Sequence, residues 1–338
     1  MDSAIIVIGL GSMGKRRIRN LKAIGQSNIV GVDNRPDRRD EVAKLHGIDT
    51  FSDLDEALTK RKPVAFVISV PPDAHHTYMK KAVSLNIPAF IEASVVDTDL
   101  TEVLKSAKEK NVFLAPSCTL YFHPAIKKIK EILASKELGV VSNILYHSGQ
   151  YLPDWHTYEH VRDYYVSNKA TGGGREIVPF ELTWITLILG LPQRVVGFYK
   201  KTIEIEGASD IDDTYNILLD YKSMIFNLSV DVVSRYATRR LVINGQKKQL
   251  YWNWDDNVIR IYDPEKNEWN DISYEILSAQ SGYNKNITEQ MYIDEMNAFI
   301  NAFSDHSKYP NSLEHDLKVL NLLYAAEKSD NTNVIQVL

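Results

Sequence analysis

Hydrophobic residues form short continuous runs in the first third of the chain, and an amphipathic segment follows each run. A continuous apolar run is typical of a strand that is buried on both faces of a parallel sheet. Apolar residues repeated every three or four positions are typical of helices. Strands that alternate with helices in this way predict a doubly wound parallel sheet. The predicted strands are 4–8, 28–33, 65–70, 89–93 and 112–117.

After about residue 120 the spacing changes, and short apolar strands follow one another directly. The Asn244-Gly245 dipeptide between two of them is a strong signal of a hairpin turn. Such a run of strands predicts an antiparallel sheet, with a helix before it at 124–135 and two helices after it at 288–304 and 313–328. The predicted strands are 140–148, 194–206, 213–221, 224–233, 239–244, 247–252 and 258–262.

These patterns predict two domains. We expect an α/β domain, built on the doubly wound parallel sheet, over residues 1–120. We expect an α+β domain with a large, mostly antiparallel sheet over residues 121–338. This second domain would serve substrate binding and oligomerisation, and its last helices would pack back on the first domain.

The second domain also carries a prediction about self-association. Its strands at 213–233 have apolar residues at alternate positions, and the few helices predicted there can cover only one face of the sheet. An exposed apolar face marks an interface. We therefore expect a homodimer or homotetramer that forms through this sheet. The alternating residues are Tyr215, Ile217, Leu219, Ile225, Leu228 and Val230.

Composition and charge narrow the classes of partner. Hydrophobic residues make up 44% and charged residues 25% of the 338, as in soluble globular proteins. The net charge of −5 disfavours binding to nucleic acid. No apolar stretch approaches the roughly 18 residues of a membrane span. The single cysteine, Cys118, fits a reducing compartment, so we expect a cytoplasmic protein with neither nucleic acid nor membrane as partner.

A glycine motif, Gly9-Leu10-Gly11-Ser12-Met13-Gly14, joins the first predicted strand to the first predicted helix. This is the context in which G-x-G-x-x-G binds a dinucleotide. The glycines permit a tight turn and close approach to the pyrophosphate, which the helix N-terminus then faces.

Asp33 ends the second strand, 19 residues after Gly14. A carboxylate there accepts hydrogen bonds from the ribose hydroxyls of NAD and repels the 2′-phosphate of NADP. Arg35 and Arg38 lie nearby and would tolerate that phosphate, so NADP stays open as the less favoured cofactor. We therefore expect residues 1–120 to form an NAD-binding Rossmann domain.

Polar and aromatic residues gather in the segment 151–165 of the second domain. If this segment is helical, His156, Glu159, His160 and Asp163 share one face. One interpretation is a solvated, salt-bridged surface. The other is a substrate wall, in which aromatic rings stack on a sugar and Arg162 binds an anionic group.

Other candidates stand beside a run of three glycines and at strand ends. Arg175, Glu176 and Glu181 follow the glycines, where they either cap and pair the next helix or contact a ligand. His75 follows the third strand, where ligands of open α/β sheets bind. His123 is either a helix-start residue or a group that contacts substrate.

Several motifs together carry a family resemblance. They are the glycine motif with Asp33, Ser69-Val70-Pro71-Pro72-Asp73-Ala74-His75, Ile91-Glu92, Tyr121-Phe122-His123-Pro124, the glycines at 172–174 before an apolar helix, and Ala325-Ala326-Glu327-Lys328-Ser329. Over nearly its whole length the chain resembles the glucose–fructose oxidoreductase / inositol dehydrogenase / MocA family. The segment 151–165 further resembles a branch that acts on sugars and sugar nucleotides.

The resemblance implies hydride transfer between a sugar carbon and a nicotinamide, and it implies no metal. It also implies a Glu-Lys-Pro motif, whose lysine relays the proton, but this chain reads Glu92-Ala93-Ser94. The position of the family's histidine falls on Phe180, and that of its aspartate near Glu176 or Ile177. The usual proton-handling side chains are therefore replaced.

We expect an NAD-dependent oxidoreductase of the CH–OH donor class, or a redox-assisted isomerase or lyase, that acts on a sugar or sugar-nucleotide derivative with a non-standard proton relay. The alternative is an NAD-binding protein without dehydrogenase activity that serves as a sensor or assembly subunit. The expected catalytic residues are His156, Glu181 and Tyr151. The expected substrate-binding residues are His123, Trp155, Arg162, Arg175 and Glu176. The expected cofactor-binding residues are Gly9, Gly11, Ser12, Met13, Gly14, Asp33, Asn34, Arg35, Ser69, Pro71, His75 and Glu92.

Overall fold

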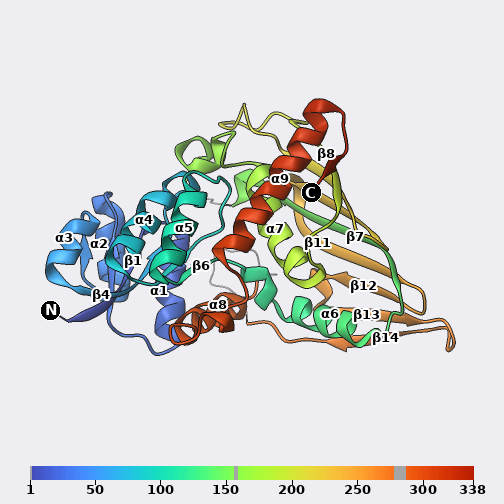
Figure 1. Cartoon of the computed structure of the whole chain (residues 1–338), viewed down its shortest axis with the longest axis horizontal. Coiled ribbons are helices and arrows are strands. Elements are labelled where there is room, and N and C mark those ends of the chain that lie inside the picture. Colours follow the sequence, from blue (N-terminus) through green and yellow to red (C-terminus); the bar gives the residue numbers. More distant parts are fainter. Residues whose placement is uncertain (1, 156–158, 278–286) are drawn as a thin grey trace. The chain divides into compact units, whose positions relative to one another are not determined.

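Two sheets, built from different parts of the chain, organise the computed structural model, which describes residues 2–155, 159–277 and 287–338 (Figure 1). The chain divides into two units. Unit 1 comprises Met1–Thr119 and Tyr292–Lys318, and unit 2 comprises Leu120–Met291 and Val319–Leu338. None of the helices in the described ranges is long and apolar enough to cross a membrane.

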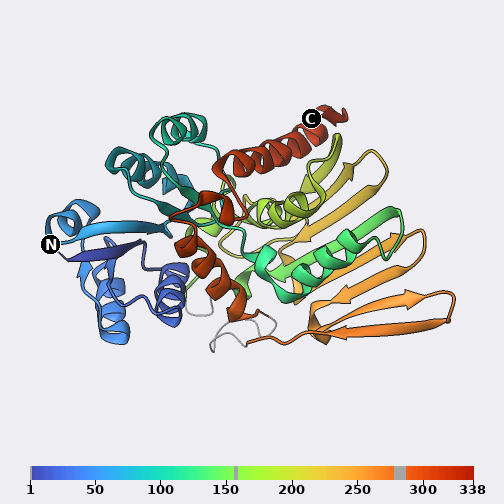
Figure 2. The same cartoon turned by 60° about the horizontal axis from the view of Figure 1, so that its bottom comes forward.

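Unit 1 is built on a parallel sheet with the strand order β3-β2-β1-β4-β5-β6, and helices cover both of its faces (Figure 2). Strands β1 to β3 are added toward one edge of the sheet and strands β4 to β6 toward the other. The strand order therefore reverses between β1 and β4, which is the switch point of the sheet. Ligands of open α/β sheets bind at the carboxyl ends of the strands at this point. The strands are β1 (Ser3–Ile8), β2 (Ile29–Val32), β3 (Thr50–Phe51), β4 (Lys62–Ile68), β5 (Ala89–Ile91) and β6 (Leu114–Pro116).

The helices of this part follow the amphipathic segments of the sequence. The apolar side chains on their inner faces are buried, as are the central strands. They are α1 (Ser12–Ala23), α2 (Pro36–His46), α3 (Leu54–Lys60), α4 (His75–Leu85), α5 (Leu100–Lys110) and, late in the chain, α8 (Glu289–Asn301). The predicted doubly wound parallel sheet is confirmed.

Unit 2 contains a nine-stranded sheet with the order β14-β13-β12-β11-β7-β10-β9-β8-β15. Neighbouring strands are antiparallel except β10 and β7, which are parallel. The predicted large, mostly antiparallel sheet is therefore confirmed. The strands are β7 (Val141–Tyr151), β8 (Arg194–Lys200), β9 (Thr214–Asp220), β10 (Ile225–Asp231), β11 (Val233–Gly245), β12 (Gln249–Asn253), β13 (Val258–Asp263), β14 (Glu268–Ser273) and β15 (Gln336–Val337).

Helices α6 (Pro124–Ser135) and α7 (Gly174–Leu189) lie along one face of this sheet, and the long C-terminal helix is α9 (Leu313–Thr332) (Figure 2). Helix α7 is apolar and packs against β9 and β10. The side chains on the other face are the exposed members of the alternating pattern, for example Leu145 on β7 and Leu218 on β9. The sheet thus has one covered and one open face.

The residues chosen from the sequence for the open face are wrong, because most of them point toward the helices. Tyr215, Ile217, Leu219, Leu228 and Val230 are each at most 1% exposed. Only Ile225 of that set is exposed. An alternating strand shows which residues share a face, but it does not tell which face the helices will cover. Exposed large hydrophobic residues of this face include Leu145, Phe198, Leu218 and Ile225.

Candidate functional site

The glycine motif of unit 1 forms the turn between β1 and α1. Gly9 has a φ of +89°, and a Cβ on it would lie 2.6 Å from the carbonyl oxygen of Ser69. A Cβ on Gly14 would lie 1.8 Å from the carbonyl oxygen of Gly9. No larger residue fits either position. Gly11 is the N-cap of α1, whose first turn contains no acidic side chain, so the positive end of the helix dipole remains available to an anion.

Asp33 lies directly after β2 and is buried beside this turn. Its carboxylate accepts hydrogen bonds from the backbone N–H of Leu10 at 2.7 Å and of Arg35 at 2.9 Å. The Arg38 guanidinium lies 3.8 Å from the same carboxylate. The Arg35 side chain pairs with Asp37. The turn and the acid at the end of β2 are thus joined directly.

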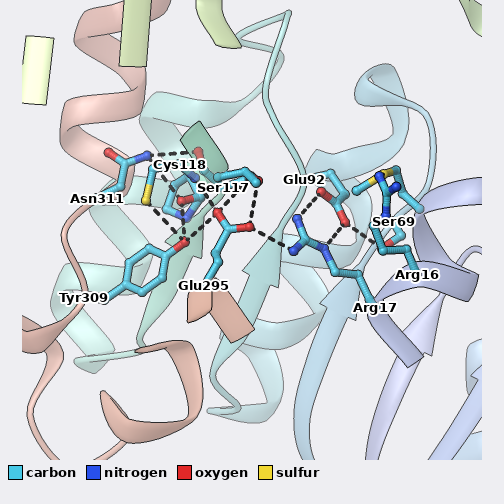
Figure 3. Close-up of polar contacts among 12 residues, drawn as sticks. Arg16, Arg17, Ser69, Glu92, Ser117, Cys118, Glu295, Tyr309 and Asn311 are labelled. Carbon is cyan, nitrogen blue, oxygen red and sulfur yellow. Dashed lines mark hydrogen bonds and ion pairs between the residues drawn. The ribbon is translucent and has the colours of Figure 1, made fainter. Parts of the chain in front are cut away.

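Glu92 follows β5 and is held rigidly from α1. The guanidinium of Arg17 donates two parallel hydrogen bonds to its carboxylate, at 2.7 and 2.8 Å, and the hydroxyl of Ser69 donates a third at 3.1 Å (Figure 3). Ser69, from the loop after β4, therefore contacts both the glycine turn and this carboxylate. A bidentate arginine–carboxylate pair fixes orientation as well as charge.

Arg17 also donates to Glu295 of α8 at 2.8 Å, and the side chains of both residues are fully buried. Glu295 in turn accepts hydrogen bonds from the Ser117 hydroxyl, the Cys118 backbone N–H and the Thr119 hydroxyl, at 3.0, 2.6 and 2.7 Å (Figure 3). The two carboxylates hold Arg17 in its charged form and raise its pKa despite the opposing effect of burial. Sequence reasoning missed Arg17 and Glu295, which are 278 residues apart.

His75 lies at the start of α4 and is 3% exposed. Burial lowers the pKa of its imidazole to about 4, so the ring is neutral at physiological pH. Its Nε2 lies 3.0 Å from the carbonyl oxygen of Val70, which assigns the proton to Nε2. Its Nδ1 has no hydrogen-bond partner among the described residues. His75 is thus a neutral acceptor near the carboxyl end of β4, and Pro71 lies exposed in the loop between them.

The candidate residues of unit 2 differ in their surroundings. Glu176 is the one discussed first, because its carboxyl has a shifted pKa and one oxygen without a partner among the described residues. It lies in the first turn of α7. Tyr165 donates a hydrogen bond to its Oε1 at 2.5 Å, and Oε2 is buried with no partner among the described residues. Burial raises the pKa of this carboxyl to about 7, against a smaller lowering effect of the tyrosine bond.

Glu181, one turn further along α7, is fully buried in an ion pair instead. Its carboxylate accepts hydrogen bonds from Arg239 at 3.0 Å, from the Tyr146 hydroxyl at 2.8 Å and from the Trp184 indole at 2.9 Å. The Arg239 guanidinium in turn lies over the rings of Phe180 and Trp254. Both oxygens of Glu181 are therefore engaged, which is the geometry of a charge that holds the sheet and the helix together.

Two candidates for substrate binding have structural partners. Arg175 pairs with Glu327 at 2.6 Å and lies over the ring of Tyr324. His123 is the N-cap of α6, and its Nδ1 accepts the backbone N–H of Ala125 at 3.2 Å. Burial lowers the pKa of His123 to about 3, which keeps this ring neutral.

The segment 151–165 is not a continuous helix. Its described part contains short 3-10 turns at Leu152–Asp154 and Val161–Asp163. The described members of the helical face considered from the sequence, Glu159, His160 and Asp163, therefore do not lie on one α-helix. His156 lies outside the described residues.

Three other candidates of this segment have different environments. Tyr151 ends β7 beneath the guanidinium of Arg235, 3.9 Å from its ring centroid. The Trp155 indole N–H is buried with no partner among the described residues. Arg162 is exposed and donates to His160 at 3.3 Å. These residues remain candidates by their position alone.

Comparison with protein families now identifies the chain. The model of an oxidoreductase family with an NAD-binding Rossmann fold matches residues 4–117, and the model of the GFO/IDH/MocA C-terminal domain matches residues 126–251. The chain belongs to the GFO/IDH/MocA oxidoreductase family. The resemblance noted from the motifs is thereby confirmed, and unit 1 contains an NAD-binding Rossmann domain.

Solved structures share this GFO/IDH/MocA fold over the full length. An Agrobacterium radiobacter oxidoreductase in complex with NAD⁺, L-tartaric acid and magnesium superimposes with a TM-score of 0.84 at 15% identity, covering 100% of this chain and 98% of its own. A Kribbella flavida oxidoreductase domain protein gives 0.82 at 17%, with coverages of 100% and 99%. A Corynebacterium glutamicum myo-inositol dehydrogenase gives 0.79 at 18%, with coverages of 100% and 99%. No curated protein matches the sequence significantly.

The geometry of unit 1 fits the dinucleotide of the GFO/IDH/MocA family. The backbone approaches within contact distance only because Gly9 and Gly14 lack a Cβ. The N-terminus of α1 would face the pyrophosphate, and Asp33 would face the adenosine ribose. The other half of the dinucleotide would then extend over β4 and β5, on the opposite side of β1 from β2.

Proposed function

We propose that the protein is an NAD-dependent oxidoreductase that transfers hydride between a hydroxyl-bearing carbon of a sugar or sugar derivative and the nicotinamide. Family membership supports the oxidoreductase class. Two structural neighbours support the substrate class, since one is named as a myo-inositol dehydrogenase and another holds L-tartaric acid. Both compounds carry neighbouring hydroxyl groups.

In this proposal NAD is the preferred cofactor and NADP the weaker one. Asp33 is buried beside the glycine turn and would meet a 2′-phosphate with like charge. The Arg35 side chain is paired with Asp37. The Arg38 guanidinium, 3.8 Å from Asp33, would contact the 2′-phosphate of NADP. His75 and Glu92, near the carboxyl ends of β4 and β5, would contact the nicotinamide half.

The observation that carries the catalytic proposal is the buried carboxyl of Glu176. Oxidation of an alcohol releases one hydride and one proton, and bound NAD⁺ supplies the hydride acceptor. Glu176 would accept the proton, since burial raises its pKa to about 7 and a base works best with a pKa near the working pH. It stands within one residue of the position expected for the family's aspartate. Tyr165 orients the carboxyl through Oε1 and leaves Oε2 for the proton.

The other candidates from the sequence have supporting roles in this proposal. Tyr151 and His156 would donate protons, and Trp155 and Arg162 would contact the substrate. Glu181, Arg175 and His123 would support the site by holding α7 and α6 in position, because each has a strong partner within unit 2.

The test compares Glu176→Gln with wild type. Purified protein is mixed with NAD⁺ and a panel of polyols, sugars and sugar nucleotides, and formation of reduced nicotinamide is followed by absorbance. Loss of a general base costs about 10²–10⁴ in rate, so Glu176→Gln should lose at least a hundredfold in turnover with unchanged NAD⁺ affinity. Glu268→Gln, an exposed residue of β14, is the matched control. Full turnover by Glu176→Gln would refute the assignment.

A non-catalytic function is the second candidate, because Ala93 and Phe180 stand where the family's lysine and histidine are expected. Such a protein would bind NAD(H) as a sensor or assembly subunit. It predicts tight binding of the dinucleotide, no reduction of NAD⁺ by any compound in the panel, and no effect of Glu176→Gln.

We also propose a cytoplasmic homodimer or homotetramer. The single cysteine supports the compartment. The exposed apolar residues on the open face of the nine-stranded sheet support the oligomer, since a soluble protein rarely leaves such residues grouped on one surface. Phe198, at 57% exposed, lies on this face and is the natural residue to test.

A further inference from the structure

A buried carboxyl group in unit 1 has no role in the site described so far. Asp316 lies in the first turn of α9 and is 3% exposed. Its one polar side-chain partner is Ser94, which is 4% exposed. Its Oδ2 has no hydrogen-bond partner among the described residues. A buried carboxylate without a counter-charge is costly, so such a group is normally protonated or faces a cation.

The position of Ser94 relates this carboxyl to the dinucleotide site. Ser94 follows Glu92 and Ala93 directly after β5, and Glu92 is fixed by Arg17. Ligands of this fold bind at the carboxyl ends of the strands. With the glycine turn after β1 and the ribose acid after β2, the end of β5 lies on the nicotinamide side. Ala93 occupies the position at which the family carries a positively charged lysine.

No ion pair of Asp316 is present within residues 2–155, 159–277 and 287–338. On its own helix, Glu314 pairs with Lys108 and Lys318, and burial lowers the pKa of His315. On the loop after β6, the Cys118 thiol has its pKa raised by burial and by the charges of Glu295 and Asp316.

The net charge near Asp316 is therefore unfavourable for an ionised carboxyl. The buried cation of α1, Arg17, is already shared by Glu92 and Glu295. Burial raises the pKa of Asp316 to about 6, and the Ser94 hydroxyl lowers it only in part.

We propose that the Ser94–Asp316 pair is a proton-exchanging element beneath the nicotinamide half of the site, which gives up its proton when the oxidised, positively charged ring binds. A nearby cation favours the ionised form of a carboxyl. The N-terminal turn of α9 favours the same form. Asp316 acts through Ser94 and is a positioning residue. The proposal rests on the proposed function in taking both redox forms of the dinucleotide as working ligands.

The proton balance of this step is simple. Before binding, Asp316 holds one proton in a fraction of molecules that depends on pH. Binding of NAD⁺ breaks the O–H bond of that carboxyl and releases the proton to solvent, with no change in oxidation state. The negative carboxylate of Asp316 then balances the positive nicotinamide ring. The methyl side chain of Ala93 carries no charge and cannot do this. NADH has a neutral ring and should cause little release.

The test measures protons rather than turnover. NAD⁺ and NADH are titrated into the protein by calorimetry at about pH 6, in two buffers of different ionisation enthalpy. The difference in heat gives the number of protons released. Wild type should release up to about half a proton per NAD⁺, because a group with a pKa of about 6 is half protonated there, and clearly less per NADH.

Variants locate the source of the proton. Asp316→Asn should release about half a proton less per NAD⁺ than wild type at this pH, while its release per NADH stays as in wild type. Ser94→Ala removes the one hydrogen bond that favours the ionised form, so its release should persist to higher pH than in wild type. Glu314→Gln, half-exposed in the same turn, is the matched control and should behave as wild type.

Three outcomes would overturn the inference. They are equal release with NAD⁺ and NADH in wild type, undiminished release by Asp316→Asn, and no shift of the pH dependence by Ser94→Ala. The comparison of the two dinucleotides needs wild type only, so it holds even if a variant does not fold. The absence of binding heat with either dinucleotide would instead contradict the proposed function.

Discussion

Removal of the Arg17 guanidinium should destabilise unit 1 severely. The substitution Arg17→Met keeps the length and apolar stem of the side chain but leaves the partly buried carboxylate of Glu92 and the fully buried one of Glu295 without their cation. Arg17 makes three charge-assisted hydrogen bonds of 2.7–2.8 Å. Each such bond is worth about 1.5–3 kcal/mol, and part of this is offset because the guanidinium no longer has to be desolvated. Breaking a buried ion pair on one side costs about 3–5 kcal/mol net.

This loss should be visible in thermal and urea unfolding. For a domain of this size, 1 kcal/mol corresponds to about 2–4 °C in Tm, so Arg17→Met should lower the unfolding temperature of unit 1 by about 6–20 °C. Hydrogen–deuterium exchange in the peptides that contain β5 and β6 assigns the loss to unit 1. Arg194→Met removes the exposed ion pair to Asp220 and should cost at most about 1 kcal/mol.

The deficit should come from the uncompensated charge of the two carboxylates. Replacing Glu92 and Glu295 by glutamine in the Arg17→Met background removes that charge and should recover part of the stability. A deficit no larger than that of Arg194→Met, or no recovery in the glutamine background, would refute the reasoning.

Three further experiments test other parts of the molecule. Asp33→Ala should weaken NAD more than NADP, as measured by fluorescence titration, and a wild type that binds NADP more tightly would contradict the cofactor assignment. Gly14→Ala should prevent folding of unit 1, because its Cβ would lie 1.8 Å from a carbonyl oxygen. The Cβ of Gly11→Ala would meet nothing closer than 3.6 Å, so this variant should fold but bind the dinucleotide more weakly. Circular dichroism distinguishes the folded variant from the unfolded one. Phe198→Glu should dissociate the oligomer in light scattering, while Leu45→Glu, equally exposed on α2, should not; a monomeric wild type would remove the basis of that prediction.

The sequence predicted those elements of the fold that have a strong hydrophobic pattern. The strands buried on both faces and the helices between them follow from that pattern. Strand β14 was missed because Glu268–Ser273 is an exposed edge strand with mostly polar residues. The two-residue strands β3 and β15 are too short to show any period. The parallel pairing of β10 with β7 was also missed, since alternation does not specify the direction of a partner.

The candidate site was predictable where local sequence determines local geometry. The glycine turn and Asp33 are of this kind, because their function depends on backbone conformation and on neighbours within one βαβ unit. The partners of Arg17 and Asp316 are not, since residues more than 200 positions away complete these clusters. Charge alone also failed to distinguish Glu181, which is neutralised by Arg239, from Glu176, which is not.

The parallel pairing of β7 with β10 has a consequence for how the chain is made. Strand β7 lies at the centre of the large sheet, yet both of its neighbours, β10 and β11, follow it by on the order of 80 residues or more. At about 5–20 residues per second, a ribosome would take roughly 4–16 s to deliver the first of them. During that time both edges of β7 would remain unpaired, and closing so long a loop is slow. Unit 2 is therefore the part of the nascent chain that most needs protection from aggregation.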